Sequence, residues 1–434
     1  MHIRATTAAA VGALFAFGAN AGELDRSQQP IGAVFAPSGT FEFSLGHVRP
    51  SVTGSDIGNT GTYDAVESYT QLGGAYTQAI NDQFSYAIIV DQPFGSDVFY
   101  DADPLTSNLG GTSATIDTTS LTFVGRYKFN ERFSVYGGPR FQEAGGSVDL
   151  NGAAYRTAFG TRAAATRLGL TTSDLAAASA GDPAAGAAVA AALVGAGVIP
   201  AAAAANPAIV GQALRGVVGA AQTAFNDAGG YRVELEDDIR VGYVLGAAYE
   251  IPDIALRASI TYNSKIEYEV DTNEQLFGPS VGTGDTAYET PQSVNLDFQT
   301  GIAEGTLLTA GYRWSDFSEF DVIPPVLGTN LSSTQDVHRF SLGVARRFTD
   351  AFAGSLTATY EKKRGDDIVS PLNPTDGQFG LTLGGRYTVD NFDVTGGVNY
   401  TWIGKAKPGV AGQPVAEFDD NHAVGLGLKV AYRF

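Results

Sequence analysis

The residues of this sequence best suited to chemistry are arginines within segments of alternating polar and apolar side chains. Arg140, Arg240 and Arg313 fall on the polar face of such segments, away from the short turns that join them. A guanidinium group can bind a carboxylate through two parallel hydrogen bonds. Most charges inside a strand-walled interior only pair with acids and stiffen the wall. We therefore single out these three as candidate contacts for a substrate carboxylate.

Residue types that support catalysis or metal binding are scarce. Beyond the N-terminus the chain has three histidines, His47, His338 and His422, and none lies in a nucleophile–histidine–acid motif. Cysteine is absent, which excludes disulfides and thiolate metal sites, and no metal-ligand cluster or phosphate-binding loop occurs. The formal net charge of -19 argues against nucleic acid as a partner. We expect no enzyme activity, no cofactor and no metal.

Strict alternation of side chains predicts strands almost throughout. In the last segment, Val424, Leu426 and Leu428 alternate with smaller or polar residues as far as Phe434. Period-two alternation gives a strand one apolar and one polar face. Many segments reach the 9–11 residues or so that a tilted strand needs to cross a bilayer. The fourteen segments are 39–49, 67–79, 83–92, 117–129, 132–143, 238–250, 253–268, 291–300, 305–316, 335–348, 351–363, 376–388, 392–402 and 421–434.

The connections predict how these strands are arranged. Short turns, such as Asn81-Asp82 and Asn130-Glu131, alternate with longer loops, as in outer-membrane barrels. Closure into a barrel leaves no open edge in lipid. We predict an all-β fold, a 14-stranded antiparallel transmembrane β-barrel over residues 39–434, surrounded by outer-membrane lipid and lipopolysaccharide. The terminal Phe434 resembles the signal that the barrel-assembly machinery reads.

Residue parity also predicts which charges face the lumen. The inward positions collect more basic than acidic side chains, although the whole chain is acidic. The predicted inward basic residues are Arg126, Lys128, Arg132, Arg140, Arg240, Arg257, Lys265, Arg313, Arg339, Arg347, Arg386, Lys429 and Arg433.

Two parts precede the first predicted strand. Residues 1–21 have the form of a signal peptide, with a charged start, an apolar core and a small-residue cleavage site at Ala19-Asn20-Ala21. Residues 22–38 follow as a plug or hatch-like segment. Its apolar or turn-forming residues Ile31, Val34, Phe35 and Pro37 are candidate gating residues. The alternative is a short disordered leader.

The long extracellular loop, residues 145–237, exceeds what a hairpin needs and should carry its own structure. It is alanine-rich and predicts helices near 155–168, 172–178, 184–194 and 207–225. In the last piece, one face carries Leu214, Val217, Val218 and Phe225. Exposed apolar surface often marks a binding site, so these four are candidate capture residues for a hydrophobic substrate. The alternative is a loop core that packs only on itself or on the barrel mouth.

Together these features resemble the FadL-type long-chain fatty-acid transporters of Gram-negative outer membranes. The stretch 39–48 with Pro50-Ser51-Val52 looks like the first strand of a divergent member. The resemblance implies that hydrophobic substrates bind at an outer groove, enter the barrel and leave when an N-terminal hatch moves. Some relatives take aromatic hydrocarbons. This chain departs from the pattern in its short pre-strand segment, and Ala36-Pro37-Ser38 stands where an Asn-Pro-Ala signature would end the hatch.

The function we expect is passive, ATP-independent transport of hydrophobic compounds, foremost long-chain fatty acids. The loop around Val217, Val218 and Phe225 would capture the substrate, lumenal arginines would guide its headgroup, and it would exit past Val34 and Phe35. The alternatives are a general diffusion porin, an importer of aromatic hydrocarbons, an outer-membrane hydrolase and an adhesin.

Overall fold

The computed structural model describes residues 24–278, 282–363, 365 and 368–434. The predicted signal peptide and the first two residues of the predicted plug lie outside the described residues.

Within the described chain, fourteen antiparallel crossings form the wall of the barrel. Eleven are single strands, and three are broken into two pieces each. In chain order they are β1 (Thr40–Ser51), β4 (Tyr69–Ala79), β5 (Phe84–Asp91) with β6 (Gly95–Phe99), β7 (Ser113–Lys128), β8 (Phe133–Leu150), β9 (Tyr231–Ile251), β10 (Leu256–Asn263) with β11 (Ile266–Gln275), β12 (Gly282–Thr290) with β13 (Ser293–Ala303), β14 (Thr306–Ser315), β15 (Val337–Arg347), β16 (Phe352–Glu361), β17 (Gln378–Val389), β18 (Phe392–Ile403) and β22 (His422–Arg433).

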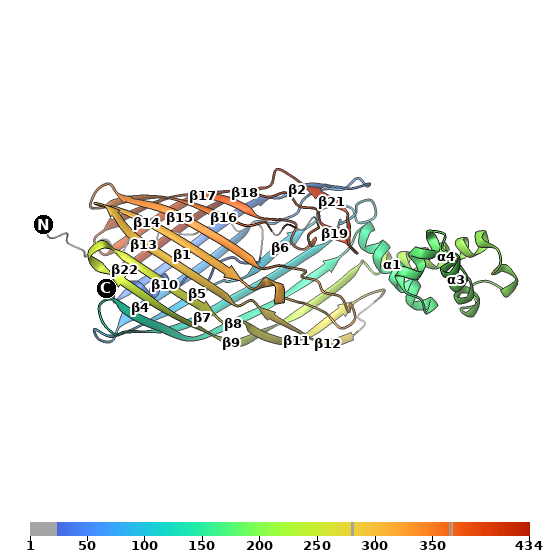
Figure 1. Ribbon diagram of the computed structural model, residues 1–434, viewed down its shortest axis with the longest axis horizontal. Coiled ribbons are helices and arrows are strands. Elements are labelled where there is room, and N and C mark those ends of the chain that lie inside the picture. The colour runs from blue at the N-terminus through green and yellow to red at the C-terminus, as the bar shows by residue number, and fades with distance from the viewer. Residues whose placement is uncertain (1–23, 279–281, 364, 366–367) are drawn as a thin grey trace.

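The sheet closes through its first strand. β1 pairs with β22 from Thr40–Arg433 to Ser51–His422, and on its other side it pairs with β4. Outward side chains are large and apolar, such as Leu72, Leu245 and Leu383, and they are at least half exposed. Such a band suits lipid rather than water. The first strand begins and the last strand ends at the same end of the barrel, as an even number of crossings requires (Figure 1). The predicted fold is confirmed.

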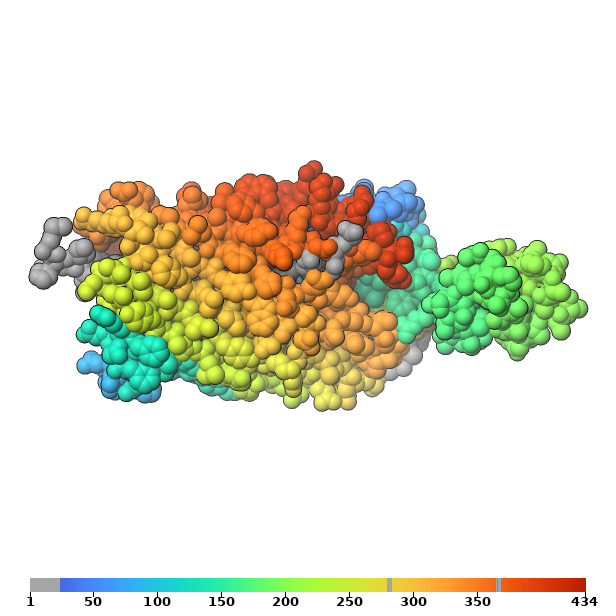
Figure 2. All heavy atoms as spheres, in the orientation of Figure 1, coloured from blue at the N-terminus to red at the C-terminus, as the bar shows by residue number. Residues whose placement is uncertain are grey.

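The predicted helices of the long loop form between β8 and β9. They are α1 (Ala153–Leu168), α2 (Thr172–Ser179), α3 (Pro183–Gly195) and α4 (Pro207–Asp227), with a short 3-10 turn η3 (Ala201–Ala203). Asp182 and Asn206 cap α3 and α4, and a proline follows each cap at the first helical position. The helices form a lobe beyond the end of the barrel opposite the termini (Figures 1 and 2). No single described helix is long and apolar enough to cross a membrane; only the bent pair α2 and α3 has that length and composition.

Loops folded inward close the extracellular mouth. Short strands β2 (Thr53–Asp56), β3 (Thr62–Asp64) and β21 (Ala416–Phe418) form a small sheet, beside the hairpin of β19 (Gly409–Val410) and β20 (Gln413–Pro414). Tyr63, Tyr100 and Phe418 pack together in the buried apolar cluster there. Burial raises the pKa of the Tyr100 phenol well above its ordinary value, and its hydroxyl donates to the Pro371 carbonyl at 2.7 Å. The mouth is therefore a dry, packed layer.

Candidate functional site

The N-terminal segment lies inside the barrel. Its 3-10 turn η2 (Gly32–Phe35) buries Ile31 and Val34 against inward side chains of the wall. The Phe35 ring meets Tyr136 edge-on at 5.6 Å, and the Thr77 hydroxyl donates to the Ala33 carbonyl at 2.7 Å. This part of the segment therefore forms a floor in the lumen against β4, β5, β7, β8 and β9, near the end of the barrel where β1 begins. Gating by this segment stays a prediction.

Charged side chains tie the start of this segment to the wall. Asp25 is fully buried and accepts two hydrogen bonds from the Arg313 guanidinium, from Nε at 2.6 Å and from Nη2 at 3.1 Å. Arg26 pairs with Asp97 at 2.5 Å and with Asp117 at 3.3 Å. Two adjacent residues of the segment thus hold different parts of the barrel wall.

The third crossing of the wall is interrupted where the segment touches it. β5 ends at Asp91 and β6 begins at Gly95, and the pairing of β5 with β4 stops at Gly74–Val90. The segment adds backbone bonds at the break, from Arg26 N to Pro93 O and from Gly95 N to Leu24 O, both 2.8 Å. On the side of β4, the Gln92 side chain accepts from the Leu72 amide at 2.9 Å. Between β4 and β5, the Gln92 side chain thus bridges the gap where their backbone ladder stops.

A lumenal cavity of about 390 Å³ reaches this break. Its lining includes Ile31 of the segment and, at the wall, Leu72, Gly73, Val90 and Gln92. Leu72 and Val90 also belong to the exposed outer face. The cavity therefore reaches the wall from the lumen at the point where the β4–β5 ladder stops.

The lumen below the break is charged. Paired inward groups are Arg126 with Glu250, Arg386 with Asp393 at 2.6 Å and Lys429 with Glu42 at 3.1 Å, whereas the Arg339–Glu361 pair lies near the extracellular ends of β15 and β16. The Arg126 and Arg257 guanidiniums also lie over the Phe35 ring, at 4.7 and 4.2 Å from its centre. Charged side chains in this region are paired with each other, and an alkyl chain would find little apolar surface there.

The lumen on the extracellular side of the break holds an apolar chamber as well as the Arg26–Asp97 pair. The chamber has a volume of about 30 Å³. Its lining includes Leu24, Phe94, Tyr288, Phe317, Phe320 and Val322. Phe317 begins the short turn η5 (Phe317–Glu319), and its ring meets Phe94 edge-on at 5.9 Å. The chamber is nearly filled by these side chains, so a ligand needs them to move apart.

Arg140 lies between the apolar chamber and the floor. On β8 the inward positions run from Ala144, which lines the chamber, through Gln142 to Arg140, at steps of roughly 7 Å. Arg140 is 4% exposed and donates through Nε to Thr122 Oγ1 at 3.0 Å. Among the described residues its Nη1 is buried and has no hydrogen-bond partner. Arg140 thus faces the lumen as a buried cation that forms no ion pair with the described residues, although the Asp91 carboxylate lies near enough to attract it.

Comparisons with known proteins agree with this architecture. The profile of the family described as outer membrane protein transport protein (OMPP1/FadL/TodX) matches residues 47–434. The chain belongs to this family. Comparison of the sequence with curated proteins gives no match.

Solved structures of low sequence identity share the fold over nearly the whole chain. A FadL homologue of Pseudomonas aeruginosa has a TM-score of 0.66 and 14% identity, covering 98% of both chains. The Pseudomonas putida toluene transporter TodX has a TM-score of 0.56 and 13% identity, covering 100% of this chain and 99% of its own. The Ralstonia pickettii toluene transporter TbuX has a TM-score of 0.56 and 12% identity, covering 93% and 92%. These structures show the shared fold, and membership of the family matched over residues 47–434 makes the protein an outer-membrane, non-enzymatic transporter of hydrophobic compounds.

The transporter brings two of the three predicted headgroup residues together. Arg140 and Arg313 are both buried in the lumen and close enough to repel each other. Arg240 lies apart from them: it is half exposed, pairs with Asp238 at 2.6 Å and donates to the Glu269 carbonyl at 3.2 Å. The backbone ladder between β9 and β11 is interrupted here, so the guanidinium reaches across to β11.

The prediction that Lys265 faces the lumen is wrong, because the crossing that carries it is also interrupted. Lys265 was expected inside by parity with Arg257, but it is exposed and pairs with Glu267 at 3.0 Å and Glu289 at 2.7 Å. The crossing breaks between Asn263 and Ile266, and the inward positions change from odd to even residues there. Every side chain beyond the break therefore swaps faces.

The predicted capture residues lie mainly inside the helical lobe. Phe225 is fully buried and stacks on Phe159 at 5.2 Å. Val217 is buried among the helices, and Leu214 and Val218 are partly buried against the same cluster. Capture by these residues stays a prediction, and it would require the helices to separate.

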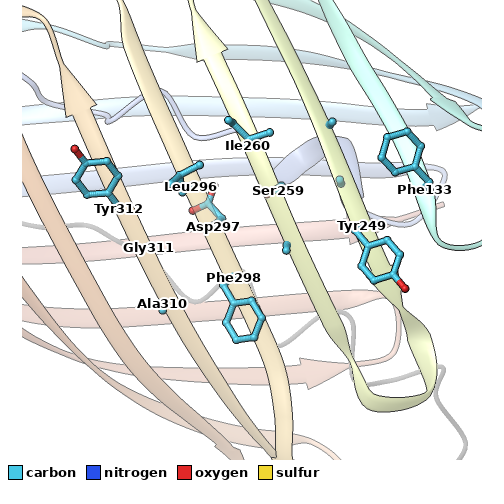
Figure 3. A pocket seen from close by; sticks show the side chains of 13 residues that line it. Phe133, Tyr249, Ser259, Ile260, Leu296, Asp297, Phe298, Ala310, Gly311 and Tyr312 are labelled. Atoms are coloured by element: carbon cyan, nitrogen blue, oxygen red, sulfur yellow. The ribbon is translucent and has the colours of Figure 1, made fainter.

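A shallow groove also lies on the outside of the barrel, separate from the lumenal cavity and chamber. It holds about 560 Å³ between Phe133, Tyr249, Ile260, Leu296, Phe298 and Tyr312, with Ala310 and Gly311 among its lining (Figure 3). Most of these large side chains belong to the outer apolar face. In the membrane, lipid chains fill such a groove, so we do not assign it to transport.

Sequence reasoning missed Asp25, Arg26 and Phe94. The first two stand in the short string Glu23-Leu24-Asp25-Arg26, and charges of both signs just ahead of an apolar segment were the available signal. Phe94 follows Pro93, and a proline within a strand often marks an interruption.

Proposed function

We propose that this transporter imports long-chain fatty acids or similar molecules with an apolar tail and one carboxylate. The observation that carries the proposal is the buried, unpaired Arg140 below an apolar chamber. Removing a guanidinium from water without a partner is costly, and a carboxylate is the group that its geometry matches best. A tail in the chamber around Phe94 and Phe317 would place the headgroup near Arg140.

We propose that the substrate leaves sideways through the break between β4 and β5, rather than past Phe35. Below the break, the floor and the paired charges around Arg126 and Arg257 disfavour an alkyl chain. At the break, the cavity lining includes Leu72 and Val90, whose side chains face lipid, so a tail that moved from the chamber past Arg26 and Asp91 would reach the membrane without crossing the floor. Small movements of Gln92 and of the Leu24–Arg26 backbone would widen this path.

Aromatic hydrocarbons are the second candidate substrates. The chamber is lined by aromatic rings, including Phe94, Phe317 and Phe320, and two of the similar solved structures are described as toluene transporters. A general diffusion porin is disfavoured, because it needs an open aqueous lumen and the mouth is a packed apolar layer.

Uptake in cells tests the proposal. A strain that lacks this gene should take up radiolabelled oleate slowly, and the gene on a plasmid should restore the rate. Toluene uptake is measured in the same strains. Restored toluene uptake without restored oleate uptake would favour the aromatic alternative, and restoration of neither would remove both.

A further inference from the structure

The far end of the helical lobe exposes an uncharged apolar surface, which we call the lobe tip. It consists of α3, the loop with η3 and the first turn of α4, residues 183–209. No Asp, Glu, Lys or Arg occurs from residue 183 to residue 214. The exposed positions of the tip are Pro183, Ala184, Ala187, Ala188, Ala191, Gly195, Ala196, Gly197, Val198, Pro200, Ala201, Ala202, Ala205, Asn206, Pro207, Ala208 and Ile209. Asn206 is the one polar side chain among them, and it caps α4.

This surface is not needed for the packing of the lobe itself. Val189, Leu193, Ile199 and Val210 fill the interior beneath it, together with Leu168 and Leu175 of the neighbouring helices. An α-helix that is apolar on every side, as α3 is, normally lies inside a protein or a membrane. Here about half of α3 faces outward. The lobe therefore presents a rigid face whose composition suits a non-aqueous neighbour.

The position of the tip keeps it clear of the acidic barrel. α4 runs back from the tip to β9, and its 21 residues span roughly 30 Å at the helical rise. The lobe stands off the barrel as a separate projection (Figure 2). Acidic residues such as Glu234, Glu236 and Glu267 crowd the upper wall, and the chain carries a net charge of -19. Repulsion of an anionic particle by these charges decays over about 8 Å in physiological salt, so it is weak at the tip.

The chemistry of the tip favours lipid over protein as its neighbour. Protein interfaces depend on a few large anchors, above all Trp, Tyr and Arg, and the exposed tip has none of these. An uncharged apolar face can instead bury itself at the boundary between the headgroups and acyl chains of a lipid surface, where binding scales with the apolar area buried. We propose that the lobe tip docks on the lipid surface of the micelles, vesicles or droplets that carry the substrate. The proposal rests on the proposed function. In it, the tip binds the surface of the lipid particle and does not bind a single substrate molecule.

Flotation tests the docking directly. The full chain in phosphatidylcholine nanodiscs is mixed with phosphatidylcholine vesicles that contain oleate, and the vesicles are floated. We expect the wild type to float with them, and Ala184→Glu/Ala191→Glu to bind roughly tenfold more weakly or less, because two apolar contacts become charges. Ala184→Gln/Ala191→Gln should weaken binding in the same direction without adding charge. The matched control, Thr157→Glu/Thr166→Glu, adds the same charge to exposed positions of α1 and should float like the wild type.

The outcomes separate the docking from transport. Wild type that fails to float, or tip variants that float equally well while their helical circular dichroism is unchanged, would overturn the docking. Nanodiscs that pair through their tips would also overturn it, in favour of a second copy as the neighbour. Oleate delivered as monomers on albumin bypasses the tip, so the tip variants should take it up normally. Normal flotation with no uptake from albumin would instead count against the proposed function alone.

Discussion

Asp25 and Arg313 form a buried ion pair that links the N-terminal segment to the opposite wall of the barrel. The two residues are 288 positions apart, and Ser293 and Asn295 accept further bonds from the same guanidinium at 3.0 and 2.8 Å. Gln29 of the segment accepts another at 3.2 Å. Because both partners are buried, the bond is not weakened by competing water. Arg313 thus holds the segment in the lumen and is already occupied, whereas Arg140 is not.

Asp25→Asn should release the segment. It leaves Arg313 buried without a counter-charge, and loss of one partner of a buried pair costs about 3–5 kcal/mol. We expect larger and more frequent openings in planar bilayers and faster tryptic cleavage after Arg26, which is 6% exposed in the intact fold. Glu361→Gln is the control, because it breaks the buried pair with Arg339 between two neighbouring wall strands and leaves the segment tied. Equal conductance in the two variants would contradict a tether role for Asp25.

Arg140→Gln should reduce transport of carboxylates selectively. A charge-assisted hydrogen bond contributes about 1.5–3 kcal/mol, so the affinity for oleate should fall at least roughly tenfold. Binding of an alkane of similar length should change little, because the chamber is untouched. Arg240→Gln removes the same charge from a half-exposed position outside the buried cluster and should behave like the wild type. Equal losses for oleate and the alkane would mean that Arg140 supports the wall and does not bind the headgroup.

The barrel could be predicted from sequence because its main physical constraint is local. One face of each strand meets lipid, so alternation alone marked the fourteen crossings, and helix signals such as Asp182-Pro183 marked the lobe. The breaks near Gln92, Ser264 and Pro291 were not predictable in the same way. They depend on neighbouring strands and on the inserted segment, and a single break moved Lys265 to the opposite face.

The candidate site was predicted only in part for the same reason. The alternation of side chains predicts that Arg140 and Arg313 both face the lumen. It does not predict that Asp25, 288 positions away, forms an ion pair with Arg313. The sequence also predicts that Leu214, Val217, Val218 and Phe225 share one apolar face of α4, and in the structure these residues are buried or partly buried. Whether helices or substrate cover it is a tertiary question, and the partner of Phe225 proved to be Phe159.

Phe225→Ala should loosen the base of the lobe without opening the barrel. Removing a fully buried ring that contacts Phe159 and Phe277 leaves a cavity, at a cost of about 3–5 kcal/mol. We expect faster proteolysis within α1 and α4, while heat-modifiable migration on gels, which reports the closed barrel, is kept. Thr223→Ala on the exposed side of the same helix is the control. Unchanged proteolysis would show that the base is held by other contacts.

Cross-linking the break in the third crossing tests the sideways exit. Leu72 and Gln92 would be the second pair beyond Gly74–Val90 if the pairing of β4 with β5 continued, after Gly73 and Asp91. The chain has no cysteine, so Leu72→Cys/Gln92→Cys adds a single defined disulfide. Oxidation should stop most oleate uptake and a reductant should restore it, because the bond ties together the two edges that must part.

Leu342→Cys/Ala358→Cys is the matched control for the cross-link. These residues are paired partners on β15 and β16, where the ladder is continuous, so a disulfide there adds no new restraint on the path. Its oxidation should leave uptake unchanged. If the Leu72–Gln92 disulfide forms fully, as shown by mass spectrometry, and uptake continues at the wild-type rate, the substrate must pass the floor at Phe35 instead. In that case Phe35→Ala, which removes the ring between Arg126 and Arg257, should change the rate while the break does not.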